Sequence, residues 1–138
     1  MGKRIHEIKV RVRYGETDQM GIVYYGNYAQ YLEMGRVEWL RSLGISYRQM
    51  EESGILLPVV SLHIDFKKPA KYDDVLVVRT ILKQKPSVKI VFDYEVYHEE
   101  SDALLITANT ILVFVNAKTG KPMTCPDFLL EKLNDVVF

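Results

Sequence analysis

The sequence is short of cysteine, of excess charge and of long apolar runs. Cys125 is the single cysteine in 138 residues, so no internal disulfide can form. Eighteen basic residues balance eighteen acidic ones, which gives no general attraction to nucleic acid. The longest apolar stretches, such as residues 111–115, are far shorter than the ~20 residues that span a bilayer. These absences predict no nucleic-acid partner and no membrane span.

Location and domain number follow from similar observations. Residues 1–20 contain no apolar run suited to a signal peptide, which predicts a cytoplasmic protein. Hydrophobic residues make up 48% of the chain and charged residues 26%, the ordinary composition of a protein that folds around a core. We therefore expect one domain over residues 1–138.

The first half of the chain changes from a period of two to a helical period. Apolar residues alternate with basic ones from Ile8 to Tyr14, which predicts a strand with one buried face. Residues 15–26 show no period and predict a loop, and residues 27–43 predict a long helix. The apolar face of that helix consists of Tyr28, Tyr31, Leu32, Gly35, Trp39, Leu40 and Leu43, with Arg36 and Arg41 outside it. Asn27 with Gln30 resembles a capping box, and Gly44 predicts the helix end.

The second half is rich in β-branched and aromatic residues. After a short helix at residues 46–52, capped by Ser46 and ended by Gly54, we expect strands at residues 55–66, 75–83, 88–97 and 104–115. A turn at residues 116–122 and a closing helix at residues 126–133 complete the chain. One long helix before a run of antiparallel strands predicts an α+β fold, in which the sheet wraps around the helix. A ferredoxin-like fold needs a second long helix between the later strands, and the sequence offers none there.

The predicted loop contains the residues with a clear chemical use. Asp18 follows a strand and precedes a helix start, where backbone N–H groups lack intrahelical acceptors. A thioester carbonyl bound there would be polarised, and Asp18 could attack its carbon or activate a water.

This loop and helix resemble the 4-hydroxybenzoyl-CoA thioesterase family and its YbgC-like acyl-CoA thioesterase branch. The resemblance rests on Asp18, Gly21, Ile22, Val23, Tyr25, Asn27, Tyr28, Tyr31, Glu33 and Arg36, and downstream on Pro69 and residues 72–76. It implies a hotdog fold and hydrolysis of an acyl-coenzyme A, with Asp18 as the catalytic carboxylate. It also implies that the backbone N–H of Tyr25 contacts the thioester oxygen, beside Gly26 as a substrate-binding residue, and that the helix starts two residues before Asn27.

The resemblance further implies where coenzyme A binds and how subunits assemble. The segment from Lys85 through Ser87 to Lys89 matches a CoA-contacting loop, and Lys67 with Lys68 offers a second place where phosphates could dock. Coenzyme A is part of the substrate, so no separate cofactor is expected, and the spacing of histidines and acids predicts no metal. Hotdog domains pair, so we expect a homodimer or homotetramer.

Several alternatives stay open at this stage. Glu33 is a rival carboxylate on the helix, and Asp18 could act either as nucleophile or as general base. The acyl carrier could be acyl carrier protein instead of coenzyme A, or the protein could bind acyl-CoA without turnover. The three histidines and Cys125 lie outside any recognisable catalytic motif and are assigned no role.

Overall fold

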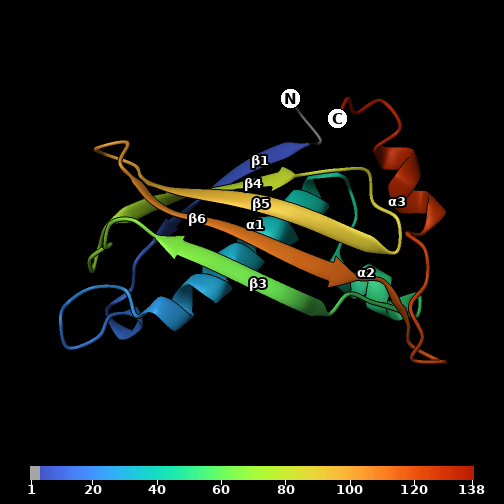
Figure 1. Ribbon diagram of the computed structural model, residues 1–138, viewed down its shortest axis with the longest axis horizontal. Coiled ribbons are helices and arrows are strands. Elements are labelled where there is room, and N and C mark those ends of the chain that lie inside the picture. Colours follow the sequence, from blue (N-terminus) through green and yellow to red (C-terminus); the bar gives the residue numbers. More distant parts are fainter. Residues whose placement is uncertain (1–3) are drawn as a thin grey trace.

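A computed structural model describes residues 4–138, and in it an antiparallel sheet covers one long helix (Figure 1). The five strands of the sheet lie in the order β1-β4-β5-β6-β3. They are β1 Ile5–Arg11, β3 Val59–Phe66, β4 Val75–Leu82, β5 Lys89–His98 and β6 Leu104–Val113. The helices are α1 Tyr28–Ser42, α2 Tyr47–Glu52 and α3 Asp127–Lys132, and a separate pair joins β2 Ile55–Leu56 to β7 Val115–Asn116. This arrangement confirms the predicted α+β hotdog fold.

The core lies between α1 and the inner face of the sheet. Side chains along β4 alternate between buried and half-buried positions, as expected for a strand that turns one face to the helix. Tyr31, Leu32 and Trp39 of α1 are almost completely buried, and the Trp39 ring meets Phe92 of β5 edge-on at 4.9 Å between centroids. Burial of such large apolar side chains is the main stabilising contribution, at about 1.5–3 kcal/mol each.

Gly35 lies where α1 approaches β4 closely. A Cβ atom at this position would lie 2.5 Å from Thr80 Oγ1 and 3.0 Å from Val78 Cγ1. Thr80 is fully buried, so neither neighbour can move into solvent. Glycine therefore sets the spacing between helix and sheet.

Gly35→Ala should lower the free energy of unfolding by about 1–2 kcal/mol. Overpacking of this kind costs about 1–3 kcal/mol, and it outweighs the gain of up to about 1 kcal/mol from the better helix propensity of alanine. Urea unfolding followed by circular dichroism measures the change. Gly15→Ala is the matched control, because nothing lies within 4 Å of a Cβ atom there, and an equal loss in both variants would contradict this account.

Two predicted strands are each interrupted. The strand expected at residues 55–66 is divided into β2 and β3 by Leu57 and Pro58, and the strand expected at residues 104–115 is divided at Phe114. Proline has no N–H to donate, so the ladder ends before it. β2 then pairs with β7 rather than with the main sheet.

The first strand is shifted from its prediction. It runs from Ile5 to Arg11, and Tyr14 begins a 3-10 turn in which its side chain is exposed. Val12 is still buried and its N–H donates to Asp74 O at 2.8 Å, so the alternation of side chains continues beyond the ladder. The period of two therefore predicted burial correctly for Val10 and Val12, and wrongly for Tyr14, which lies beyond the strand end.

The ends of α1 and α2 are explained by their local chemistry. A 3-10 turn, Tyr25–Asn27, leads directly into α1, so helical backbone begins at the position that the resemblance implied. The capping box predicted at Asn27 is wrong, because Asn27 has helical backbone and its amide donates instead to Glu16 O. Gly44, with φ of 83°, ends α1 as predicted, and Ser46 caps α2 as predicted. No helix within residues 4–138 is both long and apolar enough to cross a membrane.

Arg36 is a correction to the predicted helix face. Its side chain is buried, although the apolar period excluded it. The guanidinium lies close to the hydroxyls of Tyr47 and Tyr94. Burial raises the pKa of Tyr47 to about 12, and the Arg36 charge acts in the opposite direction. A buried arginine with polar neighbours thus belongs to the core that α1 makes with α2 and the sheet.

Candidate active site

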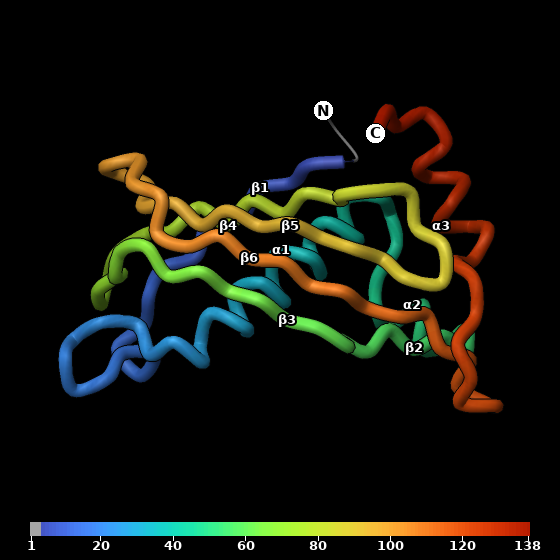
Figure 2. Tube along the Cα trace, viewed as in Figure 1, coloured from blue at the N-terminus to red at the C-terminus, as the bar shows by residue number. Residues whose placement is uncertain are grey.

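Asp18 sits at the base of a tight turn within the loop of residues 14–27. Figure 2 shows this loop, coloured blue, at the end of the sheet away from α3. Its N–H donates to Ile22 O at 2.9 Å, and its carbonyl accepts from Gly21 N at 2.9 Å. Gly21 has φ of 77°, a conformation that favours glycine, so the chain can reverse there. One carboxylate oxygen, Oδ1, accepts from Met20 N at 2.8 Å, and no residue within 4–138 bonds Oδ2. The turn therefore holds the carboxylate and leaves one oxygen available.

The second element of the site is the 3-10 turn that begins at Tyr25. The N–H groups of Asn27 and Tyr28 donate to the carbonyls of Tyr24 and Tyr25 respectively. Within residues 4–138 the N–H groups of Tyr25 and Gly26 have no acceptor. Unpaired N–H groups at a helix start carry partial positive charge, so they can stabilise an oxyanion.

A pocket of about 310 Å³ brings these elements together. It is lined by Asp18, Ile22, Val23, Tyr25, Tyr28, Phe66, Lys67, Lys68 and Pro69. The two residues predicted to be catalytic, Asp18 and Tyr25, therefore line one pocket. Lys67 and Lys68, considered from the sequence as a phosphate site, line the same pocket. The side of Gly26 on which a Cβ would project is instead covered by the Tyr24 ring, 2.9 Å from such an atom.

Three aromatic rings form the apolar wall of this pocket. Tyr28 and Phe66 meet edge-on with centroids 5.7 Å apart, and Tyr25 meets Phe66 in the same way at 6.4 Å. Burial, with a contribution from the nearby Asp74 carboxylate, raises the pKa of Tyr28 to about 12. Its hydroxyl therefore stays protonated at neutral pH.

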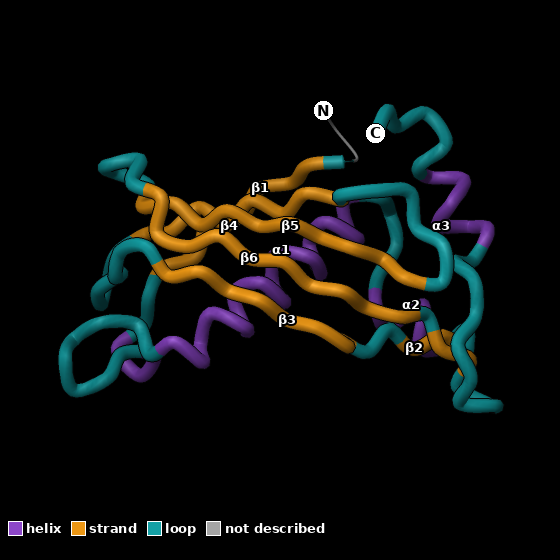
Figure 3. Tube along the Cα trace, in the orientation of Figure 1, coloured by secondary structure: helices purple, strands orange, loops and turns teal. Residues whose placement is uncertain are grey.

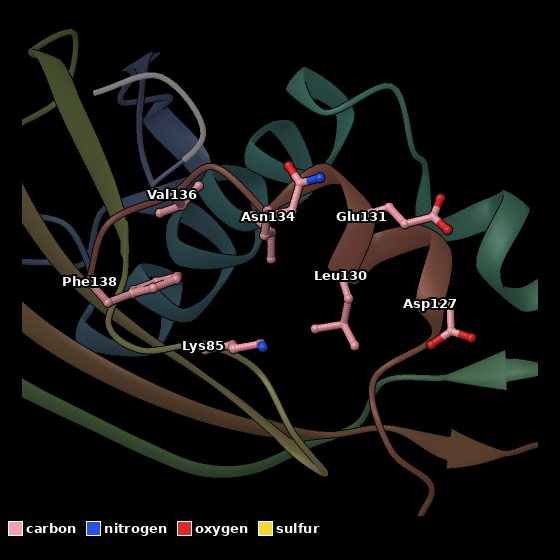
Figure 4. A pocket seen from close by; sticks show the side chains of 8 residues that line it. Lys85, Asp127, Leu130, Glu131, Asn134, Val136 and Phe138 are labelled. Atoms are coloured by element: carbon pink, nitrogen blue, oxygen red, sulfur yellow. The ribbon is translucent and has the colours of Figure 1, made fainter.

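Two other predicted residues, Lys85 and Ser87, lie in the connection between β4 and β5, away from Asp18 within one chain. Lys85 borders a different pocket, of about 480 Å³, between this connection, α3 and the C-terminal segment (Figure 4). The carbonyl of Ser87 accepts from Cys125 N at 2.7 Å, which ties the connection to the segment before α3.

The strand register shows how Lys89 relates to Asp18. Lys89 is opposite Val113, whose neighbour Leu112 is opposite Val59, so Lys89 lies at the Val59 end of the sheet. Phe66, at the other end of β3, borders the Asp18 pocket. The predicted carboxylate and the predicted CoA-contacting segment therefore lie at opposite ends of one subunit, as Figure 3 also shows for the loops at the two ends of the sheet.

Glu16 is a site residue that the sequence analysis missed. Its carboxylate is buried and bonds the hydroxyl of Tyr31 and the main chain and guanidinium of Arg13. Burial by itself would raise the pKa of Glu16, but the bonds from Arg13 and Tyr31 outweigh burial and lower it. A lowered carboxyl pKa contributes stability above the ordinary value of 4.5, and this contribution is lost as the pH falls through the folded-state pKa. The sequence carries no capping-box signal here, because Arg13 has no side-chain acceptor and only the bond from Arg13 N to the Glu16 carboxylate is formed.

Cys125, which the sequence analysis assigned no role, lies in the core. It is buried, and burial with the nearby Asp127 charge raises the pKa of its thiol to about 12. A protonated thiol is a weak nucleophile, which agrees with the absence of a cysteine motif.

The fold and the site together define a hotdog thioesterase: a helix wrapped by a sheet, and one pocket lined by both a carboxylate residue and the helix start. Residues 12–133 match the thioesterase-like superfamily. The chain belongs to this family of thioester hydrolases.

Individual relatives agree with this assignment. YneP of Bacillus subtilis (strain 168) is 39% identical over 115 residues, which is 83% of this chain and 83% of YneP. The DHNA-CoA thioesterase of Staphylococcus aureus superposes with a TM-score of 0.89 at 33% identity, over 96% of this chain and 90% of that one. The 4-hydroxybenzoyl-CoA thioesterase of Pseudomonas sp. strain CBS-3 gives 0.84 at 28% identity, over 94% and 99%. An aspartate-to-asparagine variant of a 4-hydroxybenzoyl-CoA thioesterase has been solved with 4-hydroxybenzoyl-CoA bound.

Proposed function

We propose that the protein hydrolyses acyl-CoA thioesters to a free acid and coenzyme A, with Asp18 as its catalytic carboxylate. One observation carries the proposal. The Asp18 carboxylate lines the same apolar pocket as Tyr25, where two consecutive N–H groups have no acceptor within residues 4–138.

The reaction follows from these groups. The thioester oxygen accepts hydrogen bonds from the N–H groups of Tyr25 and Gly26, so negative charge that develops on it is stabilised. Asp18 Oδ2 either attacks the carbonyl carbon or takes a proton from an attacking water. The carbon–sulfur bond then breaks, and coenzyme A leaves as a thiolate. When Asp18 is the nucleophile, water then cleaves the acyl-aspartyl anhydride, which releases the acid and regenerates the carboxylate. Free thiols have a pKa of about 8.5, so the thiolate leaves without a strong general acid.

The acyl group packs against the apolar wall of the Asp18 pocket. Tyr25, Tyr28 and Phe66 favour a planar, apolar acyl group, because edge-to-face contacts between rings contribute about 0.5–1.5 kcal/mol beyond burial. Two solved relatives are named as thioesterases of ring-containing acyl groups, the S. aureus and the Pseudomonas enzymes, which supports this preference.

A homodimer through β3 would complete the CoA site, and pairing of two dimers would give the tetramer. Within residues 4–138 β3 pairs only with β6, so its other edge is open. If two β3 strands pair in antiparallel fashion, the Val59 end of one lies beside the Phe66 end of the other. Lys85 and Lys89 of the partner subunit then lie at the same end as the Asp18 pocket. The phosphates of coenzyme A would meet these lysines together with Lys67 and Lys68.

Lys89→Ala should raise KM for an acyl-CoA up to about fivefold and leave kcat unchanged. An exposed ion pair contributes only about 0.2–1 kcal/mol, and it acts equally on bound substrate and transition state. The matching acyl-pantetheine lacks the nucleotide phosphates, so its KM should not change. Lys118→Ala, in the exposed turn after β7, is the control. An equal rise in KM for both thioesters would exclude a phosphate contact.

A panel of acyl-CoA thioesters tests the function itself. Steady-state hydrolysis of acetyl-, hexanoyl-, palmitoyl- and benzoyl-CoA should show turnover, with the highest kcat/KM for benzoyl-CoA. The same acyl groups on acyl carrier protein give the comparison for the alternative carrier. Tight binding without turnover across the panel would make the protein an acyl-CoA binder and refute the proposal. A cytoplasmic location and the absence of a separate cofactor or metal stay predictions from the sequence.

A further inference from the structure

Glu16 connects both parts of the candidate site, the turn at Asp18 and the turn at Tyr25, to α1. It ends the 3-10 turn Tyr14–Glu16, two residues before Asp18, and its side chain is buried. Oε1 accepts from the Tyr31 hydroxyl at 2.8 Å and from Arg13 N at 2.8 Å. Tyr31 lies in the first turn of α1, so one carboxylate oxygen joins the chain before Asp18 to the helix.

The main chain of Glu16 makes a second connection. Its carbonyl accepts from Tyr24 N at 2.9 Å and from Asn27 Nδ2 at 2.8 Å. Tyr24 directly precedes Tyr25, whose N–H has no acceptor within residues 4–138, and Asn27 ends the same 3-10 turn. Glu16 is therefore bonded both to the segment that leads to Asp18 and to the turn that contains Tyr25.

We propose that Glu16 is a positioning residue, which fixes the distance between the Asp18 carboxylate and the N–H groups of Tyr25 and Gly26. The proposal rests on the proposed function and adds to it a residue outside the pocket lining. Reacting groups tolerate errors of about 0.5 Å, and a misplacement of about 1 Å can lower the rate about 10²-fold. A buried anchor with three distinct bonds gives that precision to a surface loop, which otherwise would be mobile.

Glu16→Ala should lower kcat about 10²-fold with little change in KM, because substrate binding uses the pocket walls and not Glu16. Glu16→Gln should restore kcat to within about tenfold of wild type. The glutamine oxygen can still accept from Tyr31 and from Arg13 N, and only the hydrogen bond and ion pair between the Arg13 guanidinium and Oε2 are lost. That guanidinium belongs to a side chain that is 78% exposed, where ion pairs contribute little.

Tyr31→Phe provides a second variant, because it keeps the ring in the core and removes only the hydroxyl. It should lower kcat about three- to tenfold. In a double-mutant cycle with Glu16→Ala, the effects should not add, since both variants remove the same bond. Additive effects would overturn the proposed connection through Tyr31.

Amide hydrogen exchange separates positioning from simple support of the fold. Glu16→Ala should speed exchange in peptides covering residues 17–27 and leave those from β4 and β5 protected. A wild-type kcat in Glu16→Ala, or a loss of kcat explained by a smaller folded fraction, would overturn the proposal. If wild-type protein turns over no thioester, the proposed function fails and the catalytic role of Glu16 with it. Wild-type turnover with an unaffected Glu16→Ala variant refutes the positioning role alone.

Discussion

Asp18→Asn should lower kcat by about 10²–10⁴-fold and change KM little. Asparagine is nearly isosteric, and its Oδ1 can still accept the hydrogen bond from Met20 N, so the turn and the pocket should persist. What is lost is the negative charge, which both a nucleophile and a general base require. Initial rates with the best acyl-CoA of the panel measure the effect. Circular dichroism and the melting temperature should match those of the wild type.

Glu33→Gln is the decisive control for this variant. Glu33 is the other carboxylate considered from the sequence, and its side chain is exposed on α1, outside the residues that line the Asp18 pocket. Its substitution should leave kcat within about threefold of wild type. Equal losses in both variants, or full activity in Asp18→Asn, would exclude Asp18 as the catalytic carboxylate.

Single-turnover hydrolysis in ¹⁸O-water distinguishes the two roles of Asp18. If Asp18 attacks the carbonyl, an acyl-enzyme forms, and water that cleaves it at the acyl carbon places label in the product acid. When water attacks the Asp18 carbonyl of that mixed anhydride instead, label enters the Asp18 carboxylate. Direct attack of an activated water on the thioester labels only the product. Mass spectrometry of the peptide that contains Asp18 therefore provides positive evidence for the nucleophile.

The sequence predicted those parts of the fold that depend on local chemistry. Gly44 and Gly54 end helices because each adopts a positive φ, and Ser46 caps α2 through a bond to a residue three positions away. Such signals are complete within a few residues, so a single sequence contains them. The apolar period likewise predicted the buried face of α1.

What the sequence could not predict depends on contacts between distant segments. Arg36 is buried because Tyr47 and Tyr94 surround it, and neither tyrosine is near it in the sequence. The position of Glu16 in the site depends on a hydrogen bond from Tyr31, which is fifteen residues later in the chain. A pattern of apolar residues does not record which polar groups satisfy each other.

The candidate site likewise has a part that local sequence predicts and a part that depends on distant segments. Asp18 and Tyr25 lie seven positions apart in one loop, so their common pocket follows from local geometry. Lys89 is separated from them by the length of the sheet, and its predicted contact with coenzyme A requires a second subunit. Whether that contact exists depends on β3.

Leu62→Lys should dissociate the proposed dimer. Leu62 belongs to the side of β3 that faces α1, since it is opposite the buried Thr110, yet it is 46% exposed because no strand follows β3. Phe66, two pairs further along the same face, is 54% exposed. An open strand edge with exposed apolar side chains is suited to pairing with a second copy.

In a two-fold interface, Leu62→Lys would bury one lysine charge from each of the two subunits. Each buried polar group without a partner costs about 1–3 kcal/mol, so the dissociation constant should rise by about 10²–10⁴-fold. Sedimentation velocity over a range of protein concentrations measures it. At acyl-CoA concentrations below KM, turnover per subunit should fall with the dimer fraction, because KM rises when Lys85 and Lys89 of the partner subunit leave the CoA site, even though Leu62 does not line the Asp18 pocket.

Ser61→Lys is the matched control, because Ser61 is the preceding residue of the same exposed strand and pairs with Ile111 on the outer face of the sheet. A lysine there stays in water, so both the dimer and its activity should persist. If Leu62→Lys is monomeric and fully active, each subunit contains a complete site, and the phosphates must then bind Lys67 and Lys68 of the same chain. If wild-type protein is itself an active monomer, the proposed pairing through β3 is wrong, whereas the assignment of Asp18 is unaffected.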